Sequence, residues 1–211
     1  MPRILTGDET EAVRAEIGAV ARCLYAKGGM AAITMRDIAR SLGRSPMGLY
    51  RYFEDREAIV AWLRTDAFTS FSEALEHAFA SGSDAFARAR AVGRAYLDFA
   101  LKNPDAYRLM FDLSQPDDAR HTELIAAADR ASETVTRHVK DLAAAGIVHG
   151  DPLVVGQALW AAAHGVIVLH LAGRLPPGCD VTGFYLDTMR IAFRGARAVS
   201  TRAASKRAQE R

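Results

Sequence analysis

Two short helices joined by a tight turn are predicted within residues 34–53, and this segment limits the possible folds more than any other. It reads TMRDIARSLGRSPMGLYRYF. Thr34, followed three residues later by Asp37, resembles a capping box, which marks the start of the first helix. Gly43 can adopt the positive φ of a tight turn, and Ser45 followed by proline is typical of the start of a second helix. Helix, glycine turn and capped helix together predict a helix-turn-helix motif.

The rest of the 211-residue chain has the sequence pattern of further helices separated by short loops. Alanine, the best helix former, occurs forty times, against 16 glycines and 7 prolines. Glycine, proline and capping residues divide the chain into about nine helical segments, so we expect an all-α fold. The segments cover residues 9–27, 34–41, 45–52, 55–80, 84–102, 104–111, from Pro116-Asp117 to before Gly146, 151–173 and 181–199.

The helix-turn-helix segment favours binding to double-stranded DNA. In such a motif the N-terminal part of the second helix enters the major groove, and flanking residues hold phosphates. Leu49 and Phe53 are four residues apart and should pack inward, which leaves most other side chains of the second helix outside. The segment carries four arginines and one aspartate, a net charge of +3. The alternative is an amphipathic helix pair whose arginines are only solvated.

The most apolar stretch, residues 152–172, is nearly as long as a membrane span. It contains a glutamine and two histidines and is rich in alanine, so we interpret it as a buried helix of a soluble protein. No membrane partner is expected. The start of the chain has no apolar segment typical of a signal peptide. Two cysteines, Cys23 and Cys179, indicate neither a disulfide framework nor a CxxC site, and a cytoplasmic location is expected.

No enzyme class is suggested by the motifs. The sequence has no HExxH, GxSxG or P-loop motif, and its six histidines lack metal-ligand spacing. We therefore expect no catalytic residues, no cofactor and no metal. The alternative from another class is a helical ligand-binding or catalytic protein that uses its helix-turn-helix segment only for packing.

Residues 19–62 resemble the N-terminal DNA-binding domain of the TetR family of transcriptional regulators. LYAKGG at the end of the first helix, TMRDIA in the second, and SPMGLYRYFEDREAI from the third into the fourth carry the resemblance. In that family the positions of Thr34, Tyr52 and Arg56 typically contact phosphates, and those of the third helix face bases or phosphates. Together with the charge of Arg36 and the outward position of Gly48, the resemblance gives eleven candidate DNA-binding residues: Thr34, Arg36, Arg44, Ser45, Pro46, Met47, Gly48, Tyr50, Arg51, Tyr52 and Arg56.

One departure from the family pattern concerns the third helix. The commonest family sequence after the serine is Lys-Gly-Thr-Leu-Tyr, whereas this chain has Pro46-Met47-Gly48-Leu49-Tyr50. A lysine that reaches phosphate and a glycine at the groove floor are therefore missing. Met47 can instead touch a thymine methyl group, and Arg51 can donate to guanine O6 and N7.

The resemblance also implies how the chain is organised. It predicts a three-helix DNA-binding domain (1–57) and an effector-binding and dimerisation domain (58–199). The polar, basic composition of residues 200–211 predicts a disordered tail. The expected protein is a one-component regulator, a repressor that binds a pseudo-palindromic operator as a homodimer through its eighth and ninth helices. A small apolar or amphipathic ligand would release it from DNA.

The expected ligand site lies among the fourth to eighth helices. Small-molecule sites are mostly apolar, and the large side chains there give the candidates Phe68, Phe71, Tyr96, Phe99, Met110, Phe111, Trp160 and His164. The segment LWAAAHGVIVLHLAGRL is similar to the WHG C-terminal domain of one branch of the TetR family. Trp160 and His164 lie four apart on one helix face, and they are either a core pair or a ligand-facing pair.

Overall fold

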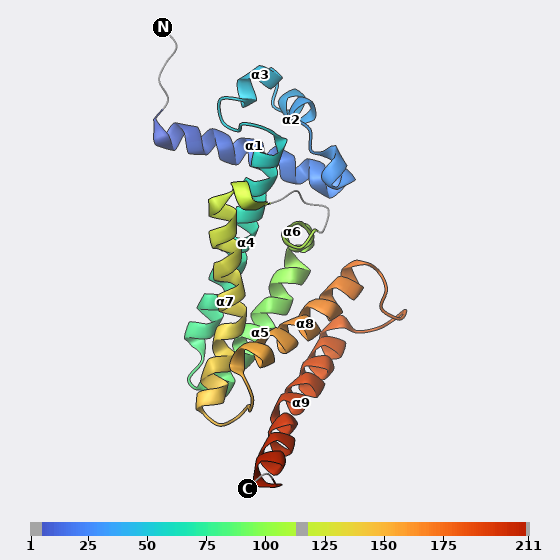
Figure 1. Ribbon diagram of the computed structural model, residues 1–211. Coiled ribbons are helices and arrows are strands. Elements are labelled where there is room, and N and C mark those ends of the chain that lie inside the picture. Colours follow the sequence, from blue (N-terminus) through green and yellow to red (C-terminus); the bar gives the residue numbers. More distant parts are fainter. Residues whose placement is uncertain (1–5, 113–117, 210–211) are drawn as a thin grey trace. The chain divides into compact units, whose positions relative to one another are not determined.

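The computed structural model describes the backbone of residues 6–112 and 118–209, and the side chains of 6–112 and 119–197 (Figure 1). Within these ranges the chain forms nine α-helices and two short 3-10 helices and contains no strand. The prediction of an all-α chain is confirmed. The α-helices are α1 (Gly7–Gly28), α2 (Met35–Ser41), α3 (Pro46–Leu49), α4 (Arg56–Ser81), α5 (Ala85–Lys102), α6 (Pro104–Met110), α7 (Thr122–Ala144), α8 (Pro152–Leu171) and α9 (Val181–Gln209).

The helices form two compact units, and the division falls within α4. The first unit contains the chain up to Phe68 together with Asp105–Ala128, and the second contains the rest. The first unit therefore extends beyond the predicted DNA-binding domain, 1–57, because the first turns of α4 and a residue of α6 pack in the same core as the motif. The division by function at residue 57 stays a prediction.

One hydrophobic core joins the helices of the first unit. Ile17 of α1, Ile38 of α2, Leu49 of α3 and Ile59 of α4 are all fully buried in it, and Leu109 of α6 belongs to the same cluster. Burial of one such side chain contributes about 1.5–3 kcal/mol relative to exposure. The short helices α2, α3 and α6 are therefore stabilised by the longer helices α1 and α4 against which they pack.

Aromatic rings and two hydroxyl groups hold the second unit together. Phe71 of α4 packs edge-to-face on Tyr96 and Phe99 of α5, with ring centroids 5.3 and 5.2 Å apart. Trp160 Nε1 of α8 donates a hydrogen bond of 3.1 Å to the Tyr96 hydroxyl. The Tyr185 hydroxyl of α9 donates one of 2.9 Å to the carbonyl of Gly93 in α5. The core of this unit thus connects four helices.

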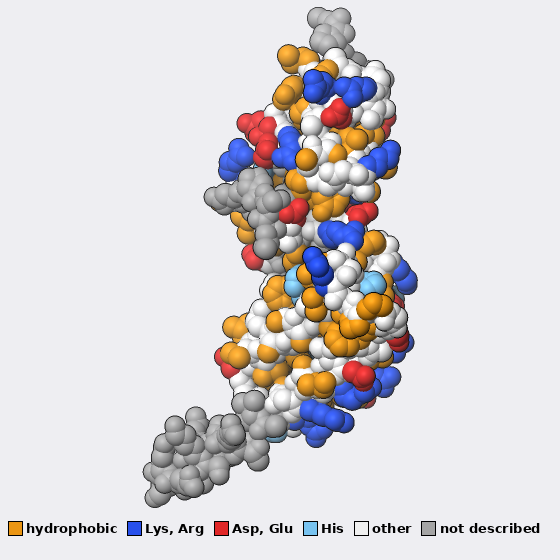
Figure 2. All heavy atoms as spheres, turned by 90° about the vertical axis from the view of Figure 1, so that its right-hand side faces the viewer, with side chains coloured by type: hydrophobic (Ala, Val, Ile, Leu, Met, Phe, Trp, Pro, Cys, Tyr) orange, Lys and Arg blue, Asp and Glu red, His pale blue; other side chains and the backbone are white. Residues whose placement is uncertain are grey.

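The apolar helix α8 is only partly covered within a single chain. Among the described residues it is the one helix long and apolar enough to cross a membrane, and 28% of its apolar window is buried. The expectation of a helix buried on most sides is therefore not met by the single chain. In the view of Figure 2, hydrophobic side chains gather on the face of the second unit that is turned toward the viewer. The large exposed apolar residues of α8 and α9 are Leu153, Val154, Val168, Leu169, Phe184, Leu186 and Ile191.

Three helix boundaries differ from the sequence prediction. α3 ends at Leu49 and continues as a turn in which the amide of Phe53 donates to the Leu49 carbonyl. The helix predicted from Pro116-Asp117 is a 3-10 helix over Asp118–Arg120 followed by α7, and residues 113–117 lie outside the described residues.

The third difference is at the C-terminal end. α9 continues to Gln209, into the segment predicted as a disordered tail, because alanine and long basic residues are good helix formers. Residues 210–211 and the side chains of the tail lie outside the described part of the chain.

Substitution of Gly43 tests whether the tight turn between α2 and α3 requires a residue with positive φ. The φ of Gly43 is +63°, and a Cβ added there meets no atom within 4 Å, so substitution strains only the backbone. Gly43→Ala should lower the free energy of unfolding by about 1–2 kcal/mol, the cost of a left-handed residue. Gly7→Ala is the control, because Gly7 has equal space but lies at the start of α1 without a positive φ. Urea denaturation checks both, and an equal effect of the two variants would contradict the role of Gly43.

Candidate nucleic-acid interface

The start of α2 is fixed by Thr34 and Asp37. The Thr34 hydroxyl accepts a hydrogen bond of 3.0 Å from the Asp37 amide and donates one of 2.6 Å to the Asp37 carboxylate. This hydrogen bond from Thr34, together with the charges of Arg40 and Arg36, lowers the pKa of Asp37. The carboxylate also pairs with Arg40 at 2.8 Å. Asp37 is therefore ionised at neutral pH and holds the capping hydroxyl in place.

The turn between the two helices is tied to α1 by an ion pair. Arg44 Nη2 lies 2.7 Å from Glu16 Oε2, and the Arg44 amide donates to the Ala39 carbonyl. Glu16 could not be found from the sequence, because the two partners are 28 residues apart and no local spacing relates them. Arg44 is a predicted DNA-binding residue, and this pair engages one edge of its guanidinium group.

The short helix α3 presents its outer side chains because its inner ones are anchored. The Ser45 hydroxyl accepts a hydrogen bond of 3.2 Å from the Gly48 amide and caps the helix. Leu49 is fully buried and Phe53 is 2% exposed, as predicted. On the opposite side, Met47 is 76% and Tyr50 is 50% exposed. The helix and its C-terminal cap therefore expose an apolar side chain, that of Met47, and the phenol of Tyr50.

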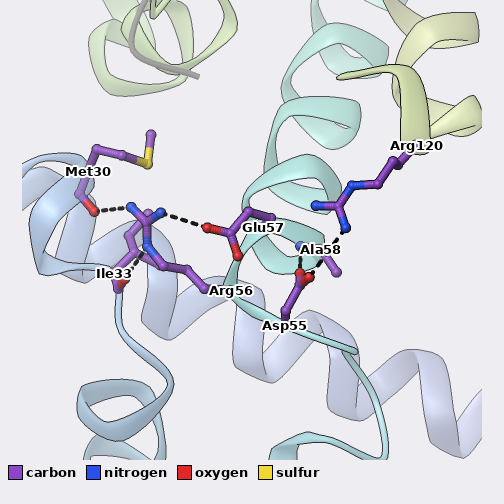
Figure 3. A network of polar contacts seen from close by, with 7 residues as sticks. All are labelled: Met30, Ile33, Asp55, Arg56, Glu57, Ala58 and Arg120. Carbon is purple, nitrogen blue, oxygen red and sulfur yellow. Dashed lines mark hydrogen bonds and ion pairs between the residues drawn. The ribbon is translucent and has the colours of Figure 1, made fainter. Parts of the chain in front are cut away.

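Arg56, the first residue of α4, makes contacts that the sequence did not suggest (Figure 3). Its Nε donates to the Ile33 carbonyl and its Nη2 to the Met30 carbonyl, each at 2.7 Å. Its Nη1 lies 3.3 Å from a carboxylate oxygen of Glu57. The guanidinium thus joins the start of α4 to the loop before α2, and much of its donor capacity is used inside the protein.

The neighbouring residue Asp55 caps the same helix. Its Oδ1 accepts a hydrogen bond of 2.7 Å from the Ala58 amide, and its Oδ2 lies 3.8 Å from Arg120 Nη1 (Figure 3). The Ala58 bond satisfies one free amide at the helix start. Asp55 and Arg56 together fix where α4 begins relative to the motif.

The structure divides the eleven predicted DNA-binding residues into two groups. Seven are exposed and lie on α2, the turn and the α3 region, whereas Thr34, Gly48, Tyr52 and Arg56 are half-buried. Arg44 is exposed but paired with Glu16. Their roles toward DNA stay predictions. The seven exposed residues are Arg36, Arg44, Ser45, Pro46, Met47, Tyr50 and Arg51.

The eight predicted ligand residues are divided between the two units. In the first unit, Phe111 makes ring contacts with Phe68 at 6.0 Å and Tyr107 at 5.0 Å, and Met110 is 1% exposed. The remaining five are in the second unit, in the aromatic core described above and its extension to His164. They are Phe71, Tyr96, Phe99, Trp160 and His164.

Trp160 and His164 form a ring pair, with centroids 5.8 Å apart. Burial lowers the pKa of His164, so its neutral form is favoured. None of the eight predicted ligand residues lines the cavity of about 690 Å³ found in the second unit. That cavity is lined in part by Arg90 and Arg94 of α5, which are not among the predicted ligand residues. The role of the eight in ligand binding stays a prediction.

The fold and motif define a helix-turn-helix protein with a second helical unit, and comparisons with known proteins give its family. A model of the bacterial regulatory proteins of the tetR family matches residues 17–62. A model of the tetracyclin repressor-like C-terminal domain matches residues 89–190. The chain belongs to the TetR family. This family is a class of regulatory proteins rather than of enzymes.

Individual relatives agree with this assignment. The chain is 30% identical over 152 residues to the HTH-type transcriptional regulator Rv1816 of Mycobacterium tuberculosis, and the match covers 68% of this chain and 61% of that relative. It therefore spans less than two thirds of the relative's length. A solved protein of unknown function from Rhodococcus sp. RHA1 has a TM-score of 0.77 and 26% identity, over 93% of this chain and 99% of that one.

A second solved structure shares the fold. It is a bacterial regulatory protein of the tetR family from Rhodococcus RHA1, with a TM-score of 0.67 and 22% identity, over 87% of this chain and 96% of that one.

Arg56→Ala tests whether this residue is structural. Loss of its hydrogen bonds to the Met30 and Ile33 carbonyls should lower the free energy of unfolding by about 1.5 kcal/mol or more. Arg108→Ala, which removes an exposed ion pair with Asp105, is the control and should cost less than about 1 kcal/mol. Chemical denaturation measures both. If Arg56→Ala unfolds like the wild type yet weakens DNA binding, the residue is a phosphate contact instead.

Proposed function

We propose that this chain is a cytoplasmic one-component transcriptional regulator that represses by binding a pseudo-palindromic operator as a homodimer. A small apolar or amphipathic ligand in the second unit releases it from DNA. The proposal rests mainly on the α3 region, whose outer side chains are exposed while Leu49 and Phe53 are buried in the core. The chain also belongs to a family of regulatory proteins. The runner-up, a helix pair used only for packing, gives no reason for Met47, Tyr50 and Arg51 to be exposed together.

The chemistry of the exposed residues suits a major groove. Arg51 can donate two hydrogen bonds to guanine, and Met47 can contact a thymine methyl group. Arg36 and Arg40 on α2 add positive charge that attracts phosphates, a contribution that weakens as salt rises. Among the residues of the motif, Asp37 is the one acidic side chain, and it is engaged by Thr34 and Arg40.

The exposed apolar residues of α8 and α9 support the homodimer. A soluble chain rarely leaves a large contiguous apolar patch in water. Two antiparallel helices from each of two copies can bury such surfaces as a four-helix bundle. A two-fold symmetric dimer also presents two copies of α3, which matches an operator built of two inverted half-sites.

The chain connectivity supports communication between the two units. The chain passes between the units within α4, before Asp105 and after Ala128. A ligand that favours one arrangement of the second unit can therefore bias the first through three covalent connections. The coupling must be reciprocal, so DNA weakens ligand binding by the same factor as ligand weakens DNA binding.

Arg51→Ala tests the base contact. The variant should lose preference at one base position in each half-site, because a bidentate arginine contributes about 1–3 kcal/mol of discrimination there. Arg108→Ala, on α6, should change neither affinity nor preference. Fluorescence anisotropy with labelled duplexes at several salt concentrations measures both variants. An unchanged base preference for Arg51→Ala would contradict the assignment.

Ile191→Asp tests the dimer. Ile191 is 71% exposed in the single chain, so an aspartate there should leave the fold intact but place a charge in the proposed interface. We expect sedimentation velocity to show a dimer for the wild type and a monomer for the variant, with equal helical content by circular dichroism. Ile125→Asp, at an exposed isoleucine of α7, should stay dimeric. A monomeric wild type, or an Ile191→Asp variant that stays dimeric, would exclude this interface.

A further inference from the structure

The second unit contains a cavity of about 690 Å³ bounded by α5, α7, α8 and α9. This volume lies within the range of about 300–1,000 Å³ typical of small-molecule sites. Leu142 of α7 and Leu159 of α8 are buried in a hydrophobic cluster, and Met189 of α9 packs against it. Phe86 of α5 and Phe193 of α9 contact edge-to-face at 6.1 Å. Packed apolar side chains from four helices thus form the wall.

Two arginines of α5 stand at this cavity. Arg90 and Arg94 both line it and are both exposed. They are four residues apart, so they lie on the same face of the helix. In the part of the chain whose side chains are described, no carboxylate forms an ion pair with either of them. Arg190 of α9 also lines the cavity, but it is paired with Asp187.

Apart from the arginines, the polar side chains of the lining add no charge at neutral pH. Burial lowers the pKa of His138 to about 4, although Asp141 acts in the opposite direction, so its ring is neutral at pH 7. The Tyr185 hydroxyl is engaged by the Gly93 carbonyl. The cavity therefore combines an apolar wall with two guanidinium groups on one helix that make no ion pair with the described side chains.

We propose that this cavity binds an anionic amphipath, with its apolar body between the four helices and its oxyanion head at Arg90 and Arg94. The inference rests on the proposed function, because it names the ligand class of the regulator. A guanidinium donates two parallel hydrogen bonds to a carboxylate or a phosphate. A neutral apolar ligand would leave both arginines unused, and a small anion would leave the wall unfilled.

Isothermal titration calorimetry on the full chain without DNA tests the site with dodecanoate, dodecanol and acetate. We expect one dodecanoate per chain, bound at least tenfold more tightly than dodecanol, and no binding of acetate. Dodecyl phosphate is measured alongside, and the tighter of the two anionic probes identifies the head group.

Substitutions separate the head from the body. The double variant Arg90→Gln, Arg94→Gln should bind dodecanoate at least tenfold more weakly and dodecanol unchanged. Lys140→Gln, Arg174→Gln removes two exposed charges of the same unit outside the cavity and should bind dodecanoate like the wild type. Phe86→Ala removes part of the wall and should weaken both probes. Thermal melting checks that each variant is folded.

Unchanged dodecanoate affinity in the Arg90, Arg94 variant overturns the inference, and so does equal affinity of the wild type for dodecanol and dodecanoate. DNA binding is measured separately by anisotropy. A chain that binds dodecanoate through the two arginines but binds no DNA keeps this inference and overturns the proposed function. A chain that binds DNA but no anionic probe keeps the proposed DNA-binding function and overturns this inference.

Discussion

Burial of Leu49 and Phe53 determines how α3 is presented, and the proposed function depends on that presentation. A helix of four residues cannot be stable alone, because helix nucleation is unfavourable. Its position must therefore come from tertiary contacts. Leu49 joins the core formed by α1, α2 and α4, and Phe53 packs there after the turn, beneath the Arg14 guanidinium at 4.8 Å. The outward direction of Met47 and Tyr50 follows from this anchoring.

Polar contacts at the edges of the core add direction to the apolar packing. Arg44 with Glu16 holds the turn against α1, and Arg56 holds the loop before α2 against the start of α4. α4 then continues into the second unit. The helix that leaves the motif is thus bonded, at its first residue, to the loop that precedes α2.

Local features of the structure could be predicted from the sequence, and distant ones could not. The capping residues Thr34, Ser45, Asp84 and Asp151 mark helix starts through bonds to amides two or three residues away. Gly43 has the expected positive φ. Contacts between residues far apart in the sequence cannot be predicted in this way, because no short sequence pattern relates the partners. Examples are the bond between Arg56 and Met30 and the walls of the cavity from α5 to α9. Side-chain type alone does not identify a ligand site, because aromatic residues fill cores as readily as they line sites.

We propose that two copies of α3 read one DNA molecule, and selection of bound duplexes from a random pool tests this proposal. We expect enrichment of a pseudo-palindrome whose half-site centres are about one helical turn, or ~34–36 Å, apart or a multiple of it. We also expect that enrichment weakens steeply as salt rises. Recovery of no shared sequence, or of a single asymmetric site, would contradict the proposal.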